Sequence, residues 1–174
     1  MKVLEKIKKI FIGIFITVFS CFILVMTILL LNFNQYGVTE FGDNSLIIIN
    51  QTITSEKYKK GDLVIVEKAD YDMIQKGDEI FAYSVNSKGK ANVEFGVVGN
   101  TYDKERAVAF ENGASFSEEY IVGKATKVYE GIGTYLAVLE SKWGFLFIVL
   151  VPGFIIFIYE LYSLIVEIRY GDEE

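Results

Sequence analysis

The segment NQTITSEKYKKGDLVIVEK, residues 50–68, places side-chain hydroxyls a few positions before a group of lysines. The hydroxyls belong to Thr52, Thr54 and Ser55, and the amines belong to Lys57, Lys59 and Lys60. A hydroxyl becomes a good nucleophile only when a neighbouring base takes its proton, so these residue types suggest nucleophilic catalysis with a lysine base. The same types also occur in ordinary exposed turns, and this simpler interpretation fits the closely spaced lysines better.

The composition limits other kinds of reactive site. The 174 residues include no histidine, and Cys21 is the single cysteine, inside a long apolar run. The chain therefore cannot form an internal disulfide or a zinc site of Cys and His ligands, and we expect no metal or other cofactor. Residues 33–141 carry 11 basic and 17 acidic side chains. An acidic domain argues against nucleic acid as a partner, because phosphates require a basic surface.

The first long apolar run extends from Ile10 to Leu31, 22 residues without a charge. As a helix it reaches about 33 Å, enough to cross a hydrocarbon core of about 30 Å. A cleaved signal peptide normally has a shorter apolar region, about 7–15 residues, followed by small residues. Here the run ends in three leucines and Asn32. We therefore predict an uncleaved membrane-spanning helix over residues 10–32.

A second apolar stretch begins at Trp143 and continues beyond Glu160 to Val166. Pro152 lies inside it, and a bilayer tolerates such a proline as a kink when other groups satisfy the freed carbonyl. Glu160 fits the polar boundary at the cytoplasmic end of the span better than it fits a buried functional carboxylate. We predict a second membrane-spanning helix over residues 142–168.

Charges beside the first span predict the orientation of the chain in the membrane. Residues 1–9 carry four lysines and one glutamate. Positive charge next to a span is held on the cytoplasmic side, and the first span usually decides the orientation. We therefore expect a plasma-membrane protein whose two ends, residues 1–9 and 169–174, are cytoplasmic. Residues 33–141 then form an extracytoplasmic domain.

This domain is predicted to consist mainly of β-strands. Short apolar runs between turn residues predict strands at residues 46–49, 63–66, 79–83, 91–98, 107–110 and 119–129, the first two of them buried. Lys-Gly-Asp occurs at residues 60–62 and again at 76–78. In both we expect a turn in which Gly adopts a special backbone angle and Asp bonds to nearby backbone. The close spacing of the strands favours an all-β barrel or sandwich between the two transmembrane helices.

Several segments occur in an order that is typical of one membrane protease family. They are KYKKGDLVIVEK, IQKGDEIFAY, FGVVGN, YIVGKATKV and the apolar segment SKWGFLFIVLVPGFIIFIYELY. Their order and spacing resemble the type I signal peptidases of the endoplasmic reticulum, archaea and some Gram-positive bacteria, which often have a second span after the catalytic domain. The resemblance covers nearly the whole chain and implies a signal-peptidase-like β-domain between the two spans.

The resemblance also implies positions for a catalytic serine, a His or Lys base and an acidic residue, and none of them is intact. Counting back eight residues from the first turn glycine places Ile53 at the nucleophile position, whereas one extra loop residue places Thr52 there. Phe95 stands where the family has its base, and Gly113 stands at the position of the acid. Glu94 is adjacent to Phe95, but neighbouring side chains of a strand face opposite sides.

We therefore expect a catalytically silent relative of the signal peptidases, acting as an assembly or chaperone factor. Its partner would be an exported precursor or a subunit of a surface structure such as a pilus. A strand edge that binds an extended peptide through main-chain bonds does not need a nucleophile. Two alternatives stay open. One is an active signal peptidase that attacks with Thr52 and uses an unrecognised base, and the other is a structural two-span membrane protein.

Overall fold

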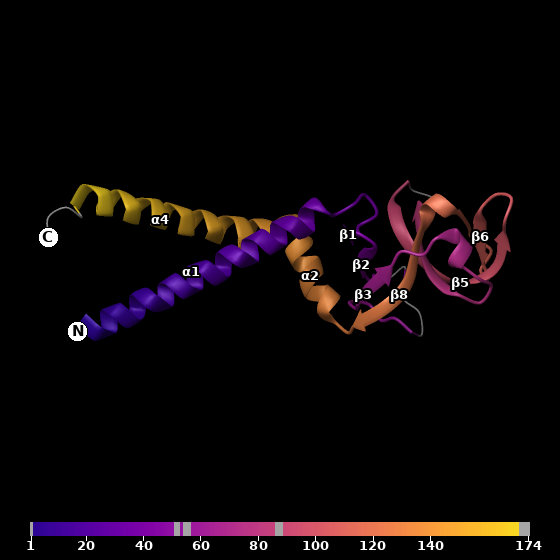
Figure 1. Cartoon of the computed structure of the whole chain (residues 1–174), viewed down its shortest axis with the longest axis horizontal. Coiled ribbons are helices and arrows are strands. Elements are labelled where there is room, and N and C mark those ends of the chain that lie inside the picture. Colours follow the sequence, from indigo (N-terminus) through magenta and orange to yellow (C-terminus); the bar gives the residue numbers. More distant parts are fainter. Residues whose placement is uncertain (1, 51–52, 54–56, 86–88, 171–174) are drawn as a thin grey trace. The chain divides into compact units, whose positions relative to one another are not determined.

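The computed structural model describes residues 2–50, 53, 57–85 and 89–170 (Figure 1). The chain forms two compact units, one made of Met1–Leu31 and Val138–Glu174 and the other of Asn32–Ala137. We call the first the helical unit and the second the sheet unit. The predicted mainly β class with two long apolar helices is confirmed at this level.

The helical unit contains two stretches that are long and apolar enough to cross a membrane, Lys6–Leu31 and Lys142–Arg169. Only 6% of each apolar window is buried within the chain, whereas the core helix of a soluble protein would be mostly buried. The elements concerned are α1 (Lys2–Leu31), α3 (Lys142–Gly144), the π-helical turn η3 (Phe145–Leu150) and α4 (Val151–Tyr170). A further helix, α2 (Ile132–Glu140), crosses the boundary between the two units.

Pro152 explains the irregular start of the second apolar helix. Proline has no N–H to donate to the preceding turn, and its ring crowds the carbonyl of that turn. The wider π-helical turn η3 ends two residues before it, so the break expected at this proline takes the form of a π-turn. The next residue, Gly153, lies close to α1, because a Cβ added to it would be 2.8 Å from Ile23 Cδ1.

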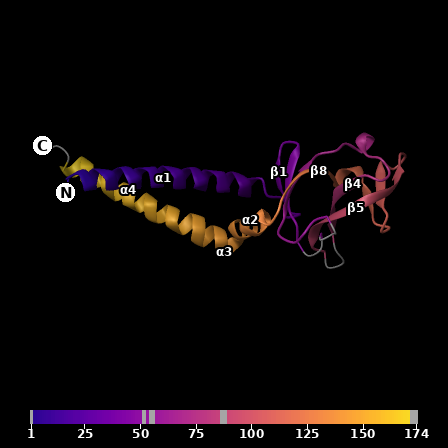
Figure 2. The same cartoon turned by 90° about the horizontal axis from the view of Figure 1, so that it is seen from below.

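The sheet unit is a single curled sheet in which every strand pair is antiparallel (Figures 1 and 2). Its order is β1-β2-β3-β8-β4-β5-β6-β7, so the last strand in sequence joins the two halves. The strands are β1 (Thr39–Phe41), β2 (Asn44–Ile48), β3 (Leu63–Glu67), β4 (Glu79–Val85), β5 (Ala91–Tyr102), β6 (Ala107–Phe110), β7 (Ser115–Ser117) and β8 (Ile121–Tyr129).

Six of these strands overlap the predicted ones, and the structure adds the short edge strands β1 and β7. Two 3₁₀ turns also occur, η1 (Tyr71–Met73) and η2 (Glu118–Tyr120), and η2 occupies the beginning of the segment predicted as the last strand. Burial in β2 differs from the prediction, because Ile47 is buried whereas Leu46 and Ile48 are only half-buried.

The two Lys-Gly-Asp turns have the predicted geometry. Gly61 and Gly77 both have φ of +92°, a region that residues with a Cβ rarely adopt. The carboxylate of Asp62 accepts a hydrogen bond from the Lys59 N–H at 2.8 Å, and that of Asp78 accepts one from the Gln75 N–H at 2.8 Å. The two turns, which precede β3 and β4, are therefore stabilised by the same local interactions.

Two apolar clusters hold the sheet unit together. The first core contains Val38, Ile47, Ile49, Ile53, Tyr58, Val64, Val66, Phe81, Val93 and Val122. The second core contains Tyr71, Ile74, Ile80, Ala82, Val98, Val108, Phe110, Phe116 and Ile121. Alternate side chains of a strand face opposite sides, so β4 supplies Phe81 to the first core and its neighbours Ile80 and Ala82 to the second.

Candidate functional site

The positions at which the resemblance implies a nucleophile and a base both belong to the first core. Ile53 is buried there, with 4% of its surface exposed, and Phe95 is half-buried against the same cluster. Thr52, the other residue considered for the nucleophile, lies outside the described residues. At Ile53 and Phe95 the structure therefore places hydrocarbon side chains, which neither attack a carbonyl nor accept a proton.

Phe95 is fixed by two aromatic neighbours. Its ring centroid lies 4.8 Å from that of Tyr58 in an edge-to-face arrangement and 5.0 Å from that of Phe81. Aromatic pairs at these separations are favourable beyond the burial of their area. The position that would carry the base contributes packing to the first core.

Lys57, the first lysine of the turn, is held in its protonated form. Its amine donates a hydrogen bond to Glu79, and this interaction raises the pKa of Lys57 above its ordinary value. A general base must be deprotonated before it can accept a proton. Lys59 and Lys60 are exposed to solvent. The described lysines of this turn thus form a solvated surface.

Gly113, at the implied position of the acid, forms the turn between β6 and β7. Its φ is +89°, its N–H donates to Phe110 O at 2.9 Å, and the N–H of Ala114 donates to the Asn112 side chain at 3.0 Å. Ala114 packs against the second core, whereas Phe95 packs against the first. The structure thus brings the nucleophile and base positions into one cluster and places the acid position beside the other.

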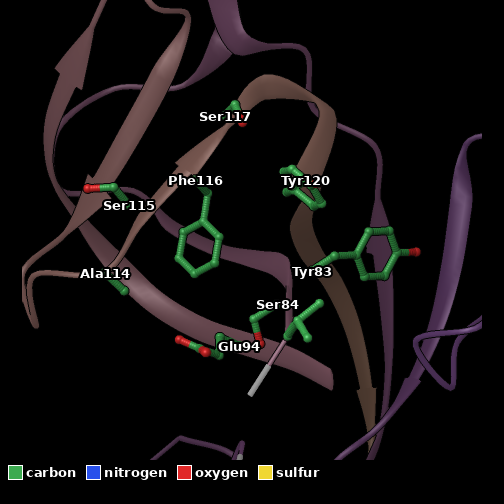
Figure 3. Close-up of a pocket in the computed structure, with 9 residues that line it drawn as sticks. Tyr83, Ser84, Glu94, Ala114, Ser115, Phe116, Ser117 and Tyr120 are labelled. Atoms are coloured by element: carbon green, nitrogen blue, oxygen red, sulfur yellow. The ribbon is translucent and has the colours of Figure 1, made fainter. Parts of the chain in front are cut away.

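Glu94 lines a hollow of about 480 Å³ in the sheet unit, on the opposite face of β5 from Phe95. Figure 3 shows Ser84 and Glu94 on one side of this hollow, with Phe116 projecting toward them from β7. The hollow is lined by Tyr83, Ser84, Val85, Glu94, Ala114, Ser115, Phe116, Ser117 and Tyr120. Phe116 also belongs to the second core, so the hollow opens at the end of that core.

One wall of the hollow is the open edge of β7, which has β6 on only one side. The N–H of Phe110 donates to Ala114 O at the turn end of the β6–β7 ladder. Residues that bond across an antiparallel ladder alternate with residues that do not. Phe116 therefore turns its main chain toward β6, whereas Ser115 and Ser117 turn their N–H and C=O groups toward the open edge.

The facing wall is the end of β4. The N–H of Val98 donates to Asp78 O at the start of the β4–β5 ladder, so the same alternation turns the N–H and C=O groups of Tyr83 and Val85 away from β5. On that side β8 pairs with β4 only as far as Ala82 among the described residues. The hollow thus lies between two strand ends whose outward main-chain groups have no neighbouring strand in the described sheet.

The side chains of the hollow are partly aromatic and partly polar. The Phe116 ring is buried and lies 4.8 Å from that of Phe110, whereas Tyr120 is exposed. The Ser84 hydroxyl is buried and has no hydrogen-bond partner among the described residues. A buried polar group without a partner lowers stability, so the Ser84 hydroxyl is an energetic cost within the wall of the hollow.

A smaller recess of about 210 Å³ shares one lining residue, Tyr83, with the hollow. The recess is lined by Glu40, Gly42, Asp43, Ser45, Lys68, Tyr83, Glu119, Ile121 and Val122. The Tyr83 hydroxyl donates to Glu40, accepts from the Asn34 amide at 2.9 Å, and its ring stacks on Tyr36 at 4.2 Å. Burial, and then the bond to Glu40, raises the pKa of Tyr83, so its hydroxyl stays a donor at neutral pH.

Within the described part of the chain, no group of three or more His, Cys, Asp or Glu side chains is arranged to hold a metal ion. Sequence reasoning did not point to the hollow, because its lining comes from three separate segments. Comparison of the chain with family models, with curated proteins and with solved structures found no match.

Proposed function

We propose that this chain is a membrane-anchored, catalytically silent relative of the type I signal peptidases that holds an extended segment of an exported protein. The observation that supports binding is the hollow between the open edge of β7 and the end of β4 that extends beyond its pairing with β8. The hydrocarbon packing at Ile53 and Phe95 supports the proposed loss of catalytic activity. The order and spacing of the sequence segments that resemble the type I signal peptidases support the proposed relationship to that family.

An extended segment suits the hollow because strand edges recognise peptides through main-chain groups. A guest strand exchanges N–H and C=O bonds with the edge, and its alternate side chains enter pockets beside it. Ser115 and Ser117 offer such bonds on β7, and Tyr83 and Val85 offer them on β4. A volume of about 480 Å³ lies within the usual range of binding sites, roughly 300–1,000 Å³.

The proposed location in the membrane indicates which class of protein the chain would bind. Two apolar stretches fit two spans, and the lysines of residues 1–9 favour cytoplasmic ends, which puts the sheet unit outside the cytoplasm. A protein that crosses the plasma membrane in an unfolded form presents extended segments there. Labelling of a cysteine introduced at Glu105, an exposed residue of the sheet unit, checks this orientation, and labelling only from the cytoplasmic side would overturn it.

The substitution Ser117→Pro tests binding at the β7 edge. Ser117 has φ of −72°, which proline adopts without strain, and its N–H points away from β6. Proline therefore removes one outward donor and leaves the β6–β7 ladder intact. Ser117→Ala is the matched control, because it removes the hydroxyl and keeps the N–H.

Binding is measured by fluorescence polarisation with the full chain in a neutral detergent and a capped peptide of alternating Val and Thr. One main-chain bond contributes about 0.5–1.5 kcal/mol, so Ser117→Pro should weaken binding about twofold to tenfold and Ser117→Ala should not. Equal binding by both variants would exclude the β7 edge. If the wild-type chain is dimeric and the proline variant monomeric, the edge binds a second copy and the proposal fails.

The full chain in neutral detergent also tests the proposed loss of peptidase activity. A secretory precursor incubated with the wild-type chain should remain uncleaved, because positioned acid or base catalysis is worth roughly 10² to 10⁴ in rate and Phe95 cannot supply it. Cleavage that disappears in a Thr52→Ala variant would establish the active signal peptidase instead.

A further inference from the structure

The charged residues around the hollow and its recess are mostly acidic. Among the described lining residues, four carry carboxylates and one carries an amine. They are Glu94 in the hollow and Glu40, Asp43, Glu119 and Lys68 in the recess. When these groups are ionised, Glu94 gives the hollow a charge of −1 and the recess carries −2, so a cationic occupant of the hollow is favoured.

Glu94 is placed to meet such a cation directly. Its carboxylate lines the hollow below Phe116, and none of the ion pairs among the described residues includes it (Figure 3). Glu94 is half-buried, so a charge partner there is less screened by water than on an open surface. An incoming cation therefore displaces no ion-pair partner that belongs to the described residues.

The aromatic side chains favour arginine among the possible cations. Phe116 and Tyr120 line the hollow together with Glu94. A guanidinium group is planar, stacks on aromatic rings and bonds to a carboxylate through two N–H groups at once. Lysine offers a compact ammonium that stacks less well.

We infer that the extended segment bound between β4 and β7 carries an arginine whose guanidinium pairs with Glu94 and packs against Phe116 and Tyr120. This inference rests on the proposed function and adds the chemistry of the ligand. The main-chain groups of Tyr83, Val85, Ser115 and Ser117 hold the segment in any sequence. The Glu94 carboxylate favours segments that carry an arginine.

Three capped peptides of alternating Val and Thr test the selection, with Arg, Gln or Glu at the central position. The wild-type chain in a neutral detergent should bind the Arg peptide about tenfold more tightly than the Gln peptide, a difference of about 1.4 kcal/mol. The Glu peptide should bind most weakly. A neutral detergent is needed because a basic peptide also binds to anionic lipid.

The Glu94→Gln variant keeps the size of the side chain and removes its charge. It should bind the Arg and Gln peptides within about twofold of each other. Glu105→Gln is the control, because it removes the same charge from an exposed turn outside both cavities and should keep the tenfold preference. Near-ultraviolet circular dichroism confirms that each variant is folded.

The outcomes separate this inference from the proposed function. Equal binding of all three peptides by the wild-type chain leaves peptide binding in place and overturns the arginine selection. A preference for Arg that survives in Glu94→Gln overturns the role of Glu94. Binding of none of the peptides overturns the proposed function and, with it, this inference.

Discussion

Truncating Phe95 to alanine should lower the free energy of unfolding of the sheet unit by about 3 kcal/mol. The change removes two aromatic pairs, with Tyr58 at 4.8 Å and with Phe81 at 5.0 Å. Each pair contributes about 0.5–1.5 kcal/mol beyond its buried area. Half of a phenylalanine's burial adds about 1 kcal/mol, and the total stays at the low end of the 3–5 kcal/mol range for fully buried phenylalanines.

The control for this change is Tyr102→Ala. Tyr102 is an aromatic residue of the same strand with 44% of its surface exposed, and its truncation should cost about 0.5 kcal/mol or less. The comparison isolates the effect of burial at position 95 from the general effect of losing an aromatic ring on β5.

Unfolding of the full chain in detergent is followed by the near-ultraviolet circular dichroism of tyrosine, because most of the tyrosines lie in the sheet unit. A loss of 3 kcal/mol corresponds to a fall of about 12–24 °C in the melting temperature of a domain of this size. A fall no larger than that of Tyr102→Ala would show that Phe95 does not stabilise the first core. The account of the base position as a packing position would then be wrong.

Two further predictions concern a glycine and a carboxylate. Gly123→Ala should lower the free energy of unfolding by about 3 kcal/mol or more, because φ is +143° and the added Cβ would lie 1.9 Å from Glu67 O. Gly77→Ala is the control, because a Cβ there meets open space and the substitution should lower the free energy of unfolding only by its backbone strain of about 1–2 kcal/mol. Urea unfolding compares the two variants, and equal losses would contradict the close approach. The hydrogen bond from Lys124 lowers the pKa of Asp78 below its ordinary 3.8, so the stability that this group contributes is present above that value and is lost as the pH falls through the lower, folded value. Asp78→Asn should thus be less stable than the wild type at neutral pH by less than about 1 kcal/mol, and the gap should close below about pH 4 in the same unfolding assay. A gap that widens in acid would contradict this sign.

The parts of the fold that depend on local chemistry could be predicted from the sequence. The Lys-Gly-Asp turns need only a glycine with positive φ and an aspartate that bonds to the backbone two or three residues away, and both requirements are visible in three letters. The separation of Glu94 from Phe95 onto opposite faces of β5 follows from the alternation of a strand. The apolar helices follow from uninterrupted hydrophobicity.

The edge strand β7 could not be predicted in this way. Its sequence is Ser-Phe-Ser, with one apolar residue and no strand-length pattern. The strand exists because β6 offers a ladder and because Phe116 packs on Phe110 at 4.8 Å. Both causes are tertiary, and they override the weak local preference of the segment.

The hollow was missed for a related reason. Its wall from β4, its floor residue Glu94 and its wall from β7 become neighbours only when the sheet curls. No spacing along the chain signals their proximity. The one available signal was that the side chain of Glu94 faces the opposite side of the strand from Phe95. By itself this signal does not reveal a cavity.

Catalysis and strand-edge binding respond differently to substitution, because they use different parts of a chain. Catalysis by a nucleophile and base depends on two particular side chains, and loss of either removes most of the rate. A strand edge binds through N–H and C=O groups that every residue except proline carries. Hydrocarbon at Ile53 and Phe95 is therefore compatible with the proposed binding, because it supports the sheet whose far edge carries the hollow. On this reasoning Ser117→Pro should weaken binding of the proposed extended segment by about twofold to tenfold, whereas a change in the first core that leaves the sheet folded should not.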